Sequence, residues 1–353
     1  MGRRKRVSKN TVKPKFSTYL KGALISLVLL AVLIAFAGYF IALKPNVKSS
    51  KELVLYIPSN ATYPEVLDSL KKQVISNKYT FKWMAELMGY PSLIKGGRYV
   101  LAPDLNNLDL IRKLRAGIQD PILVTLSSKR TYQEALGQFS HNLECDSLSM
   151  VDEFESTLVG VKGDVRGTYL IPNTYEFYWN TSCVQVVRRL LDEQQAFWNT
   201  SRLEKAKKLG LSKEQVFILA SIVQKETAKE DEMPRVAGVY LNRLKKGMKL
   251  QADPTLVYLL KVKMNKVGRV LNEDKKIKSP YNTYIYKGLP PGPIYIASPK
   301  VIDATLNAES HAYLYFCAKE DFSGYHNFAK TYREHLSNAQ RYHRELNRRK
   351  IFR

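Results

Sequence analysis

The chain is 353 residues long, enough for two or three small domains with buried cores, and its 45% hydrophobic and 25% charged residues are typical of a folded protein. Its formal net charge of +24 is unusual and implies an anionic partner, such as nucleic acid, membrane headgroups or an acidic polymer. The three cysteines, Cys145, Cys183 and Cys317, exclude a disulfide framework, because at most one pair can form, and none has metal-ligand spacing.

The N-terminus carries an uncharged apolar segment over residues 22–43, long enough to cross a bilayer as a helix. The preceding residues 1–21 hold only basic charges: Arg3, Arg4, Lys5, Arg6, Lys9, Lys13, Lys15 and Lys21. The positive-inside rule therefore predicts a cytoplasmic basic tail, with residues 44–353 outside the cytoplasm. A cleaved signal peptide is the alternative, disfavoured because the apolar segment is long and lacks a small-residue cleavage site. This topology argues against nucleic acid and favours envelope polyanions or anionic lipid.

A small domain is predicted over residues 50–118, after a short polar linker. Its expected order is strand, helix, helix, strand, helix: 52–57, 66–74, 80–88, 96–101 and 108–115. Gly117 closes the last helix.

Residues 119–353 are expected to form a second, mostly helical and loop-rich domain, so the fold class is α+β. In chain order we expect a strand at 121–126, a helix at 132–143, an aromatic-rich loop at 167–177, helices between 184 and 246, a loop-rich segment at 248–300, a strand at 313–317 and a basic helix from residue 332.

One predicted helix, Ser212 to Thr227, places a carboxylate on an apolar stripe. At about 100° per residue, the stripe comprises Leu219, Ile222, Val223 and Glu226. A capping-box pattern of Ser212 and Gln215 supports the start of this helix. An acid facing an apolar core tends to have a raised pKa, so it holds a proton near neutral pH, as a general acid must. The structural alternatives are a buried Glu226 paired with Arg or Lys, and a frayed helix end.

Polar and aromatic residues downstream form candidate sugar-binding loops: Asn242, Arg243, Gln251, Asp253, Thr255, Tyr281, Asn282 and Tyr284. Amides and hydroxyls suit sugar hydroxyls, and aromatic rings suit the apolar sugar faces. Alternatively, these groups merely tie the loops together. His326 is a further candidate base or ligand, although a lone histidine beside a strand is more often structural. No nucleophile elbow and no phosphate-binding glycine loop is present in the sequence. We expect no metal, since the cysteines lack metal-ligand spacing and the five histidines do not cluster with them, and we expect no cofactor.

Several segments together resemble one family in order and spacing, the endolytic murein transglycosylases of the YceG-like type: Leu219–Thr227, Val239–Leu244, Gly247–Thr255, Ser279–Tyr284, Gly288–Ile294, Tyr313–Phe316 and His326–Phe328. The Tyr169–Phe177 loop, the N-terminal anchor and the 50–118 unit, which is similar to a LysM-like subdomain, extend the resemblance. The family carries a catalytic Glu in a Glu-Lys-Glu-Thr motif. Here Gln224 takes the first position, so only Glu226 remains.

The resemblance implies cleavage of the β-1,4 bond between N-acetylmuramic acid and N-acetylglucosamine in peptidoglycan strands, with a 1,6-anhydro end as product, so that nascent strands are terminated or trimmed. Glu226 would act first as general acid and then as base, and the sites above, His326 included, would bind substrate. The implied location is the inner membrane, single-pass, with residues 119–353 as a periplasmic catalytic domain. Peptidoglycan and the membrane are the implied partners, and the cell-wall synthesis machinery is left open.

Two other functions stay open at this point. One is a non-catalytic peptidoglycan-binding scaffold in which Glu226 is structural. The other is a muramidase-type hydrolase that uses Glu226 with Asp253, because hydrolases normally need a pair of carboxylates.

Overall fold

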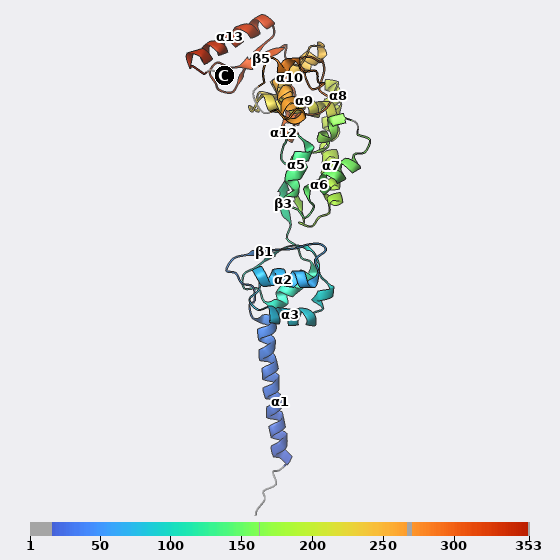
Figure 1. The fold of residues 1–353 in the computed structure, drawn as a ribbon, viewed down its shortest axis with the longest axis vertical. Helices are drawn as coiled ribbons and strands as arrows, with labels where there is room; N and C mark the ends of the chain where they lie inside the picture. The colour runs from blue at the N-terminus through green and yellow to red at the C-terminus, as the bar shows by residue number, and fades with distance from the viewer. Residues whose placement is uncertain (1–15, 162, 267–269, 352–353) are drawn as a thin grey trace, which may run out of the picture. The chain divides into compact units, whose positions relative to one another are not determined.

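The computed structural model describes residues 16–161, 163–266 and 270–351, arranged in two compact units, Met1–Asp120 and Pro121–Arg353 (Figure 1). The first fifteen residues of the expected basic tail lie outside the described residues. Each unit has its own hydrophobic core.

The first unit begins with a long apolar helix, α1 (Phe16–Gly38), which continues into one π-helical turn, η1 (Tyr39–Leu43). The stretch Tyr19–Leu43 has a mean hydropathy of 2.7 and is long enough to cross a membrane, so it could be an anchor or a signal sequence. Its side chains are almost all exposed to the surroundings, as expected for a helix that is apolar on every face. The helix begins before residue 22, so it is longer than the sequence pattern indicates.

The remainder of the first unit follows the expected order of elements. It comprises β1 (Leu53–Ile57), α2 (Tyr63–Gln73), α3 (Lys78–Leu87), a short 3₁₀ turn η2 (Tyr90–Ser92), β2 (Gly97–Leu101) and α4 (Asn107–Ala116). The two strands pair antiparallel, from Leu53 opposite Leu101 to Ile57 opposite Gly97. Gly117 ends α4 with a φ of +71°, a conformation that glycine adopts without steric strain.

The second unit opens with a mixed region. It comprises β3 (Ile122–Thr125), α5 (Tyr132–Ser140), α6 (Ser147–Thr157), a 3₁₀ segment η3 (Gly163–Tyr169), β4 (Thr174–Phe177), α7 (Cys183–Phe197) and α8 (Thr200–Leu209). The expectation of a continuous loop over 167–177 was wrong at its end, because β4 pairs antiparallel with β3. Tyr175 and Phe177 alternate into the core, which is the period of a strand. A disulfide joins Cys145 to Cys183, and Cys317 is free.

The rest of the second unit is built around α9. The elements are α9 (Lys213–Glu226), α10 (Met233–Lys245), α11 (Asp253–Tyr258), a π-helical turn η4 (Leu259–Lys263), a 3₁₀ turn η5 (Asp274–Lys276), α12 (Pro299–Leu306), β5 (Tyr315–Ala318), β6 (His326–Ala329) and α13 (Tyr332–Arg348). Residues 216–223 of α9 are all buried, because α8, α10, α11 and α12 pack around it. The middle of α9 is therefore enclosed on every face rather than on one stripe.

Two segments differ from the loops expected in this region. Asp253 and Pro254 start α11 rather than a turn, since proline is well tolerated in the first turn of a helix. His326 lies within β6, which pairs antiparallel with β5, rather than beside a strand. In the described part of the chain the sheets are three separate antiparallel pairs among many helices, a mixture of helix and sheet as the sequence predicts.

Candidate active site

Glu226 is the last residue of α9, and buried neighbours fix its backbone. The expected capping box is present at the start of the helix. The backbone N–H of Gln215 donates to Ser212 Oγ (3.2 Å), and the backbone N–H of Ser212 donates to Gln215 Oε1 (2.9 Å). Thr227 is extended, so the chain turns away directly after the acid. The helix does not fray before Glu226, and its side chain is held at the edge of the core.

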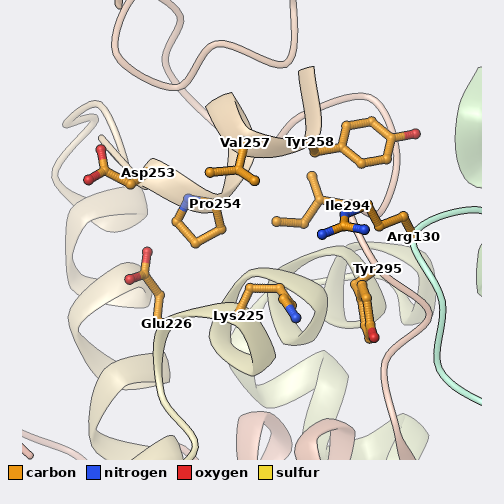
Figure 2. A pocket seen from close by; sticks show the side chains of 9 residues that line it. All are labelled: Arg130, Lys225, Glu226, Asp253, Pro254, Val257, Tyr258, Ile294 and Tyr295. Carbon is orange, nitrogen blue, oxygen red and sulfur yellow. The ribbon is translucent and has the colours of Figure 1, made fainter. Parts of the chain in front are cut away.

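A pocket of about 260 Å³ opens beside this acid. It is lined by Arg130, Lys225, Glu226, Asp253, Pro254, Val257, Tyr258, Ile294 and Tyr295. Figure 2 shows the carboxyl groups of Glu226 and Asp253 on one side of the pocket, with Arg130 and Tyr295 on the other. The α9 terminus, the start of α11 and the loop before α12 supply its walls, so the pocket exists only in the folded unit.

The surroundings of Glu226 favour its protonated form. Burial raises the pKa of this carboxyl to about 7, against a hydrogen bond from Tyr240 that lowers it. The negative charge of Asp253 raises this pKa further, and the positive charge of Arg243 lowers it. Tyr240 Oη donates to Glu226 Oε1 at 2.6 Å. Near neutral pH the group therefore exists in both forms, as a group that both donates and accepts a proton must.

Arg243 does not neutralise Glu226 through a direct ion pair. Its buried guanidinium donates to three backbone carbonyls, those of Leu314 (2.7 Å), Leu250 (2.8 Å) and Lys249 (3.2 Å). Within the described residues no Lys or Arg lies within ion-pair distance of the Glu226 carboxyl. The arrangement therefore differs from the structural alternative of a buried Glu–Arg or Glu–Lys pair.

Asp253 and Tyr284 come together next to the pocket. Tyr284 Oη donates to Asp253 Oδ1 at 2.5 Å, which orients the carboxylate. Burial raises the pKa of Tyr284, followed by its hydrogen bond to Asp253 and by the charges of Asp253 and Glu226, so the hydroxyl stays a donor. Asp253 itself is exposed at the first turn of α11. Asp253 lines the pocket, and Tyr284 supports it through this hydrogen bond.

Other predicted site residues hold the surrounding loops in place. Asn242 donates to the carbonyls of His311 (2.7 Å) and Tyr313 (3.0 Å). Asn282, fully buried, donates to the carbonyls of Lys275 (3.0 Å) and Ile277 (2.8 Å). Their amides are occupied by backbone groups, and neither residue lines the pocket. Contact between them and a substrate stays a prediction.

Three further candidates, Thr255, Tyr281 and Gln251, make internal hydrogen bonds and do not line the pocket. Thr255 Oγ1 donates to the Ala252 carbonyl at 2.7 Å, and Tyr281 Oη donates to Asp164 Oδ2 at 2.8 Å. Gln251 adopts a φ of +50°, and its N–H donates to the Thr283 carbonyl at 3.0 Å. This left-handed residue sets the direction in which the chain enters α11 and thereby aims Asp253.

His326 lies away from the pocket lining. Its backbone N–H donates to Glu232 Oε1 and its Nδ1 lies against Glu232 Oε2, both at 2.9 Å. The ring packs edge-on against Phe316. These contacts tie β6 to the start of α10, a structural placement, and a role in substrate binding stays a prediction.

Sequence reasoning missed several residues that shape the site. Tyr240 stands within the family-like segment Val239–Leu244 and three positions before Arg243, so helical spacing could have identified it. Lys225 adjoins the acid in sequence. Arg130 and Tyr295 carry no signal at all, because only tertiary folding brings them to the pocket. Among the described residues no cluster of His, Cys, Asp and Glu is arranged to hold a metal ion.

The chain is similar in sequence to known proteins along most of its length. The sequence model of the YceG-like family matches residues 55–341, so the chain belongs to the YceG-like family. The chain is similar to an endolytic murein transglycosylase of Bacillus subtilis (strain 168), with 29% identity over 325 residues, 85% of this chain and 88% of that protein.

Two further relatives extend the comparison. An endolytic murein transglycosylase of Streptococcus pneumoniae serotype 2 (strain D39) is 27% identical over 349 residues, 85% of this chain but only 62% of that protein, so the chain spans less than two thirds of it. A crystal structure of a yceG-like protein from Listeria monocytogenes matches with a TM-score of 0.54 and 25% identity, covering 82% of this chain and 99% of that one. The family resemblance expected from the sequence is thus confirmed.

Proposed function

We propose that this protein is a lytic transglycosylase that cleaves the β-1,4 bond between N-acetylmuramic acid and N-acetylglucosamine in peptidoglycan strands. The product would be a 1,6-anhydro-muramyl end, so the enzyme would terminate or trim nascent strands. Family membership and the names of the two relatives support the reaction class. The observation that carries the proposal is Glu226, an acid with a pKa of about 7 at the edge of an open pocket.

The proposed reaction uses Glu226 twice. The protonated carboxyl donates its proton to the glycosidic oxygen as the bond from the muramyl C1 to that oxygen breaks. The muramyl C6 hydroxyl then attacks C1, and its proton passes to the Glu226 carboxylate, which restores the acid. Tyr240 and Arg243 favour the carboxylate between these steps, whereas burial favours the acid, and their balance leaves both forms accessible.

Asp253 gives a specific reason to weigh hydrolysis as a second candidate. It lines the same pocket as Glu226, so a water molecule between the two carboxylates could attack C1. The two reactions differ by one water molecule in the product. Mass spectrometry distinguishes them, because hydrolysis leaves a reducing muramic acid and transglycosylation leaves the anhydro form.

We further propose that Tyr19–Leu43 is a retained inner-membrane anchor, with the N-terminus cytoplasmic and the catalytic region outside. Ile41 and Ala42 pack on the core of the first unit, and Asn107 Nδ2 donates to the Ile41 carbonyl at 2.7 Å. Cleavage after this segment would remove those contacts. The Cys145–Cys183 disulfide also suits an oxidising compartment.

We also propose separate roles for the two units, binding of peptidoglycan and catalysis. Residues 50–118 would be a LysM-like subdomain that contacts peptidoglycan, and residues 119–353 the catalytic domain. The strand-helix-helix-strand-helix order of the first unit supports this assignment. Glu226 and its pocket lie entirely within the second unit.

The test compares products released from purified sacculi by the full-length protein and by Glu226→Gln. We expect anhydro-muropeptides from the wild type and none from the variant. Glu214→Gln is the matched control, because Glu214 lies in the first turn of the same helix and does not line the pocket. Full activity of Glu226→Gln would refute the role of this acid, and sacculus binding without any cleavage by the wild type would favour a scaffold.

A further inference from the structure

The pocket beside Glu226 is polarised, with unpaired cations on the wall that faces away from Asp253. Lys225 Nζ lies 4.3 Å from the centre of the Tyr295 ring. Arg130 lies between β3 and α5 and reaches the same wall (Figure 2). In the part of the chain that the structure describes, neither side chain forms an ion pair with an acid, whereas nearby Lys263 is paired with Asp164 at 2.8 Å.

These cations repel one another. Burial, followed by the charges of Arg130 and Lys261, lowers the pKa of Lys225. Like charges held together without an acid are unfavourable, and an anionic ligand group would relieve the repulsion. The wall therefore has the electrostatic character of an anion-binding site.

A second cavity adjoins the first at Arg130. This cavity, of about 190 Å³, shares Arg130 and Tyr258 with the first and is lined further by Tyr132, Gln133 and the ion pair of Lys263 with Asp164. Arg130 thus stands at the junction of the two cavities. A branched ligand could place one part beside Glu226 and another part past Arg130.

We propose that Arg130 and Lys225 bind a carboxylate of the peptide attached to the muramyl sugar, so that the site selects peptide-bearing strands. Glycan hydroxyls and acetamides are neutral, whereas the peptide branch carries carboxylates, and a guanidinium binds these with paired hydrogen bonds. This inference rests on peptidoglycan being the substrate proposed above.

Binding measurements on the Glu226→Gln variant test the proposed carboxylate site without requiring cleavage of the substrate. The probes are soluble disaccharide oligomers with and without their peptides, titrated calorimetrically. Adding Arg130→Gln should weaken binding of the peptide-bearing probe by about tenfold or more, as expected for a lost charged hydrogen bond, and leave the peptide-free probe unchanged. Lys129→Gln is the control, since this neighbouring cation does not line the pocket.

Equal effects on both probes, or none, would overturn the carboxylate site. Failure of the catalytic proposal would show separately, as absence of anhydro products from the wild type. The two failures can therefore be told apart.

Helix α3 in the first unit has an exposed apolar face. Its outer face carries three large apolar side chains four residues apart: Tyr79 (73% exposed), Trp83 (55%) and Leu87 (67%). The opposite face, including Phe81 and Ala85, is buried in the core. None of the described residues covers this stripe, Tyr79–Trp83–Leu87.

The stripe lies close to the end of the apolar N-terminal segment. Helix α3 packs against η1, and Asn107 Nδ2 bonds both Thr80 Oγ1 (3.2 Å) and the Ile41 carbonyl (2.7 Å). Figure 1 shows α3 at the end of the first unit where α1 joins it. If η1 lies at the bilayer boundary, α3 must lie there too.

From this continuity we infer that the stripe sits in the headgroup region of the outer leaflet and holds the first unit against the membrane. Tyr and Trp have apolar rings with polar tips and are enriched at membrane interfaces. On the same helix, Lys78 Nζ lies 4.9 Å from the centre of the Tyr79 ring, and Lys82 forms an exposed pair with Glu86 at 3.9 Å. Long exposed cationic side chains beside such a stripe can reach lipid phosphates. The inference rests on Tyr19–Leu43 being a retained span.

The test uses the full chain in phosphatidylcholine vesicles whose lipids are brominated near the headgroup. Trp83→Phe should remove most of the lipid-dependent quenching of tryptophan fluorescence. In the same background, Val54→Trp on β1, at a position 39% exposed, should restore fluorescence but not quenching.

Quenching unchanged by Trp83→Phe, or equal for Val54→Trp, would overturn the inference. If the stripe binds a protein instead of lipid, Trp83→Phe should leave the quenching unchanged in vesicles that contain lipid alone. Failure of the chain to float with the vesicles would also overturn it, since the span would then be absent.

Discussion

Replacing Glu226 by Gln should stabilise the second unit at high pH while abolishing cleavage. Glutamine keeps the shape of the side chain, and its carbonyl can still accept the hydrogen bond from Tyr240. What the substitution removes is a charge that burial disfavours. The proposed proton donor therefore costs the folded protein stability at high pH.

The size and direction of the effect follow from the pKa of Glu226. The folded protein raises it from 4.5 to about 7, so the native state binds the proton more tightly than the unfolded state does. Wild-type stability is consequently lost as pH rises through this window, by about 3 kcal/mol in total. The free energy of unfolding of Glu226→Gln should therefore exceed that of the wild type by about 3 kcal/mol near pH 8, and the two should be almost equal near pH 4.

The assay is urea unfolding of both full-length proteins at the two pH values and constant ionic strength. Trp198, buried in the second unit, reports the transition by its fluorescence. Glu214→Gln serves as control and should show no such pH-dependent gain, because Glu214 is not enclosed by the core. A difference between wild type and Glu226→Gln that stays constant with pH would refute a raised pKa at this site.

Two neighbours of Glu226 should shift the pH dependence of activity in opposite directions, and the disulfide should affect stability alone. Tyr240→Phe removes a hydrogen bond that lowers the pKa of Glu226, so the loss of activity with rising pH should move to higher pH in a pH–rate profile. Asp253→Asn removes a like charge that raises the same pKa, so that loss should move to lower pH; a shift in the same direction for both variants would contradict the assignment. Cys145→Ser opens the loop of separation 38 closed with Cys183 and should lower unfolding free energy by about 3 to 4 kcal/mol in oxidising buffer but not after reduction of both proteins.

Local signals in the sequence were enough to predict much of the first unit and the helix that bears the acid. The alternation at 52–57, the capping pattern at Ser212 and the apolar spacing before Glu226 are all short-range, and backbone geometry converts them directly into elements. Because these signals are short-range, they did not predict elements that depend on distant residues. Strand β4 and the helix begun by Asp253 and Pro254 depend on distant neighbours that no short window contains.

For the candidate site, the sequence by itself determined that a carboxylate, Glu226, ends an apolar helix, and this predicts a raised pKa and the role of acid for that residue. Only the tertiary structure decided what surrounds it. Folding places Tyr240 within hydrogen-bond distance, sets Asp253 as a like charge nearby and brings Arg130 to the far wall. Charge interactions and cavities depend on distances through space, and separation along the chain does not contain them.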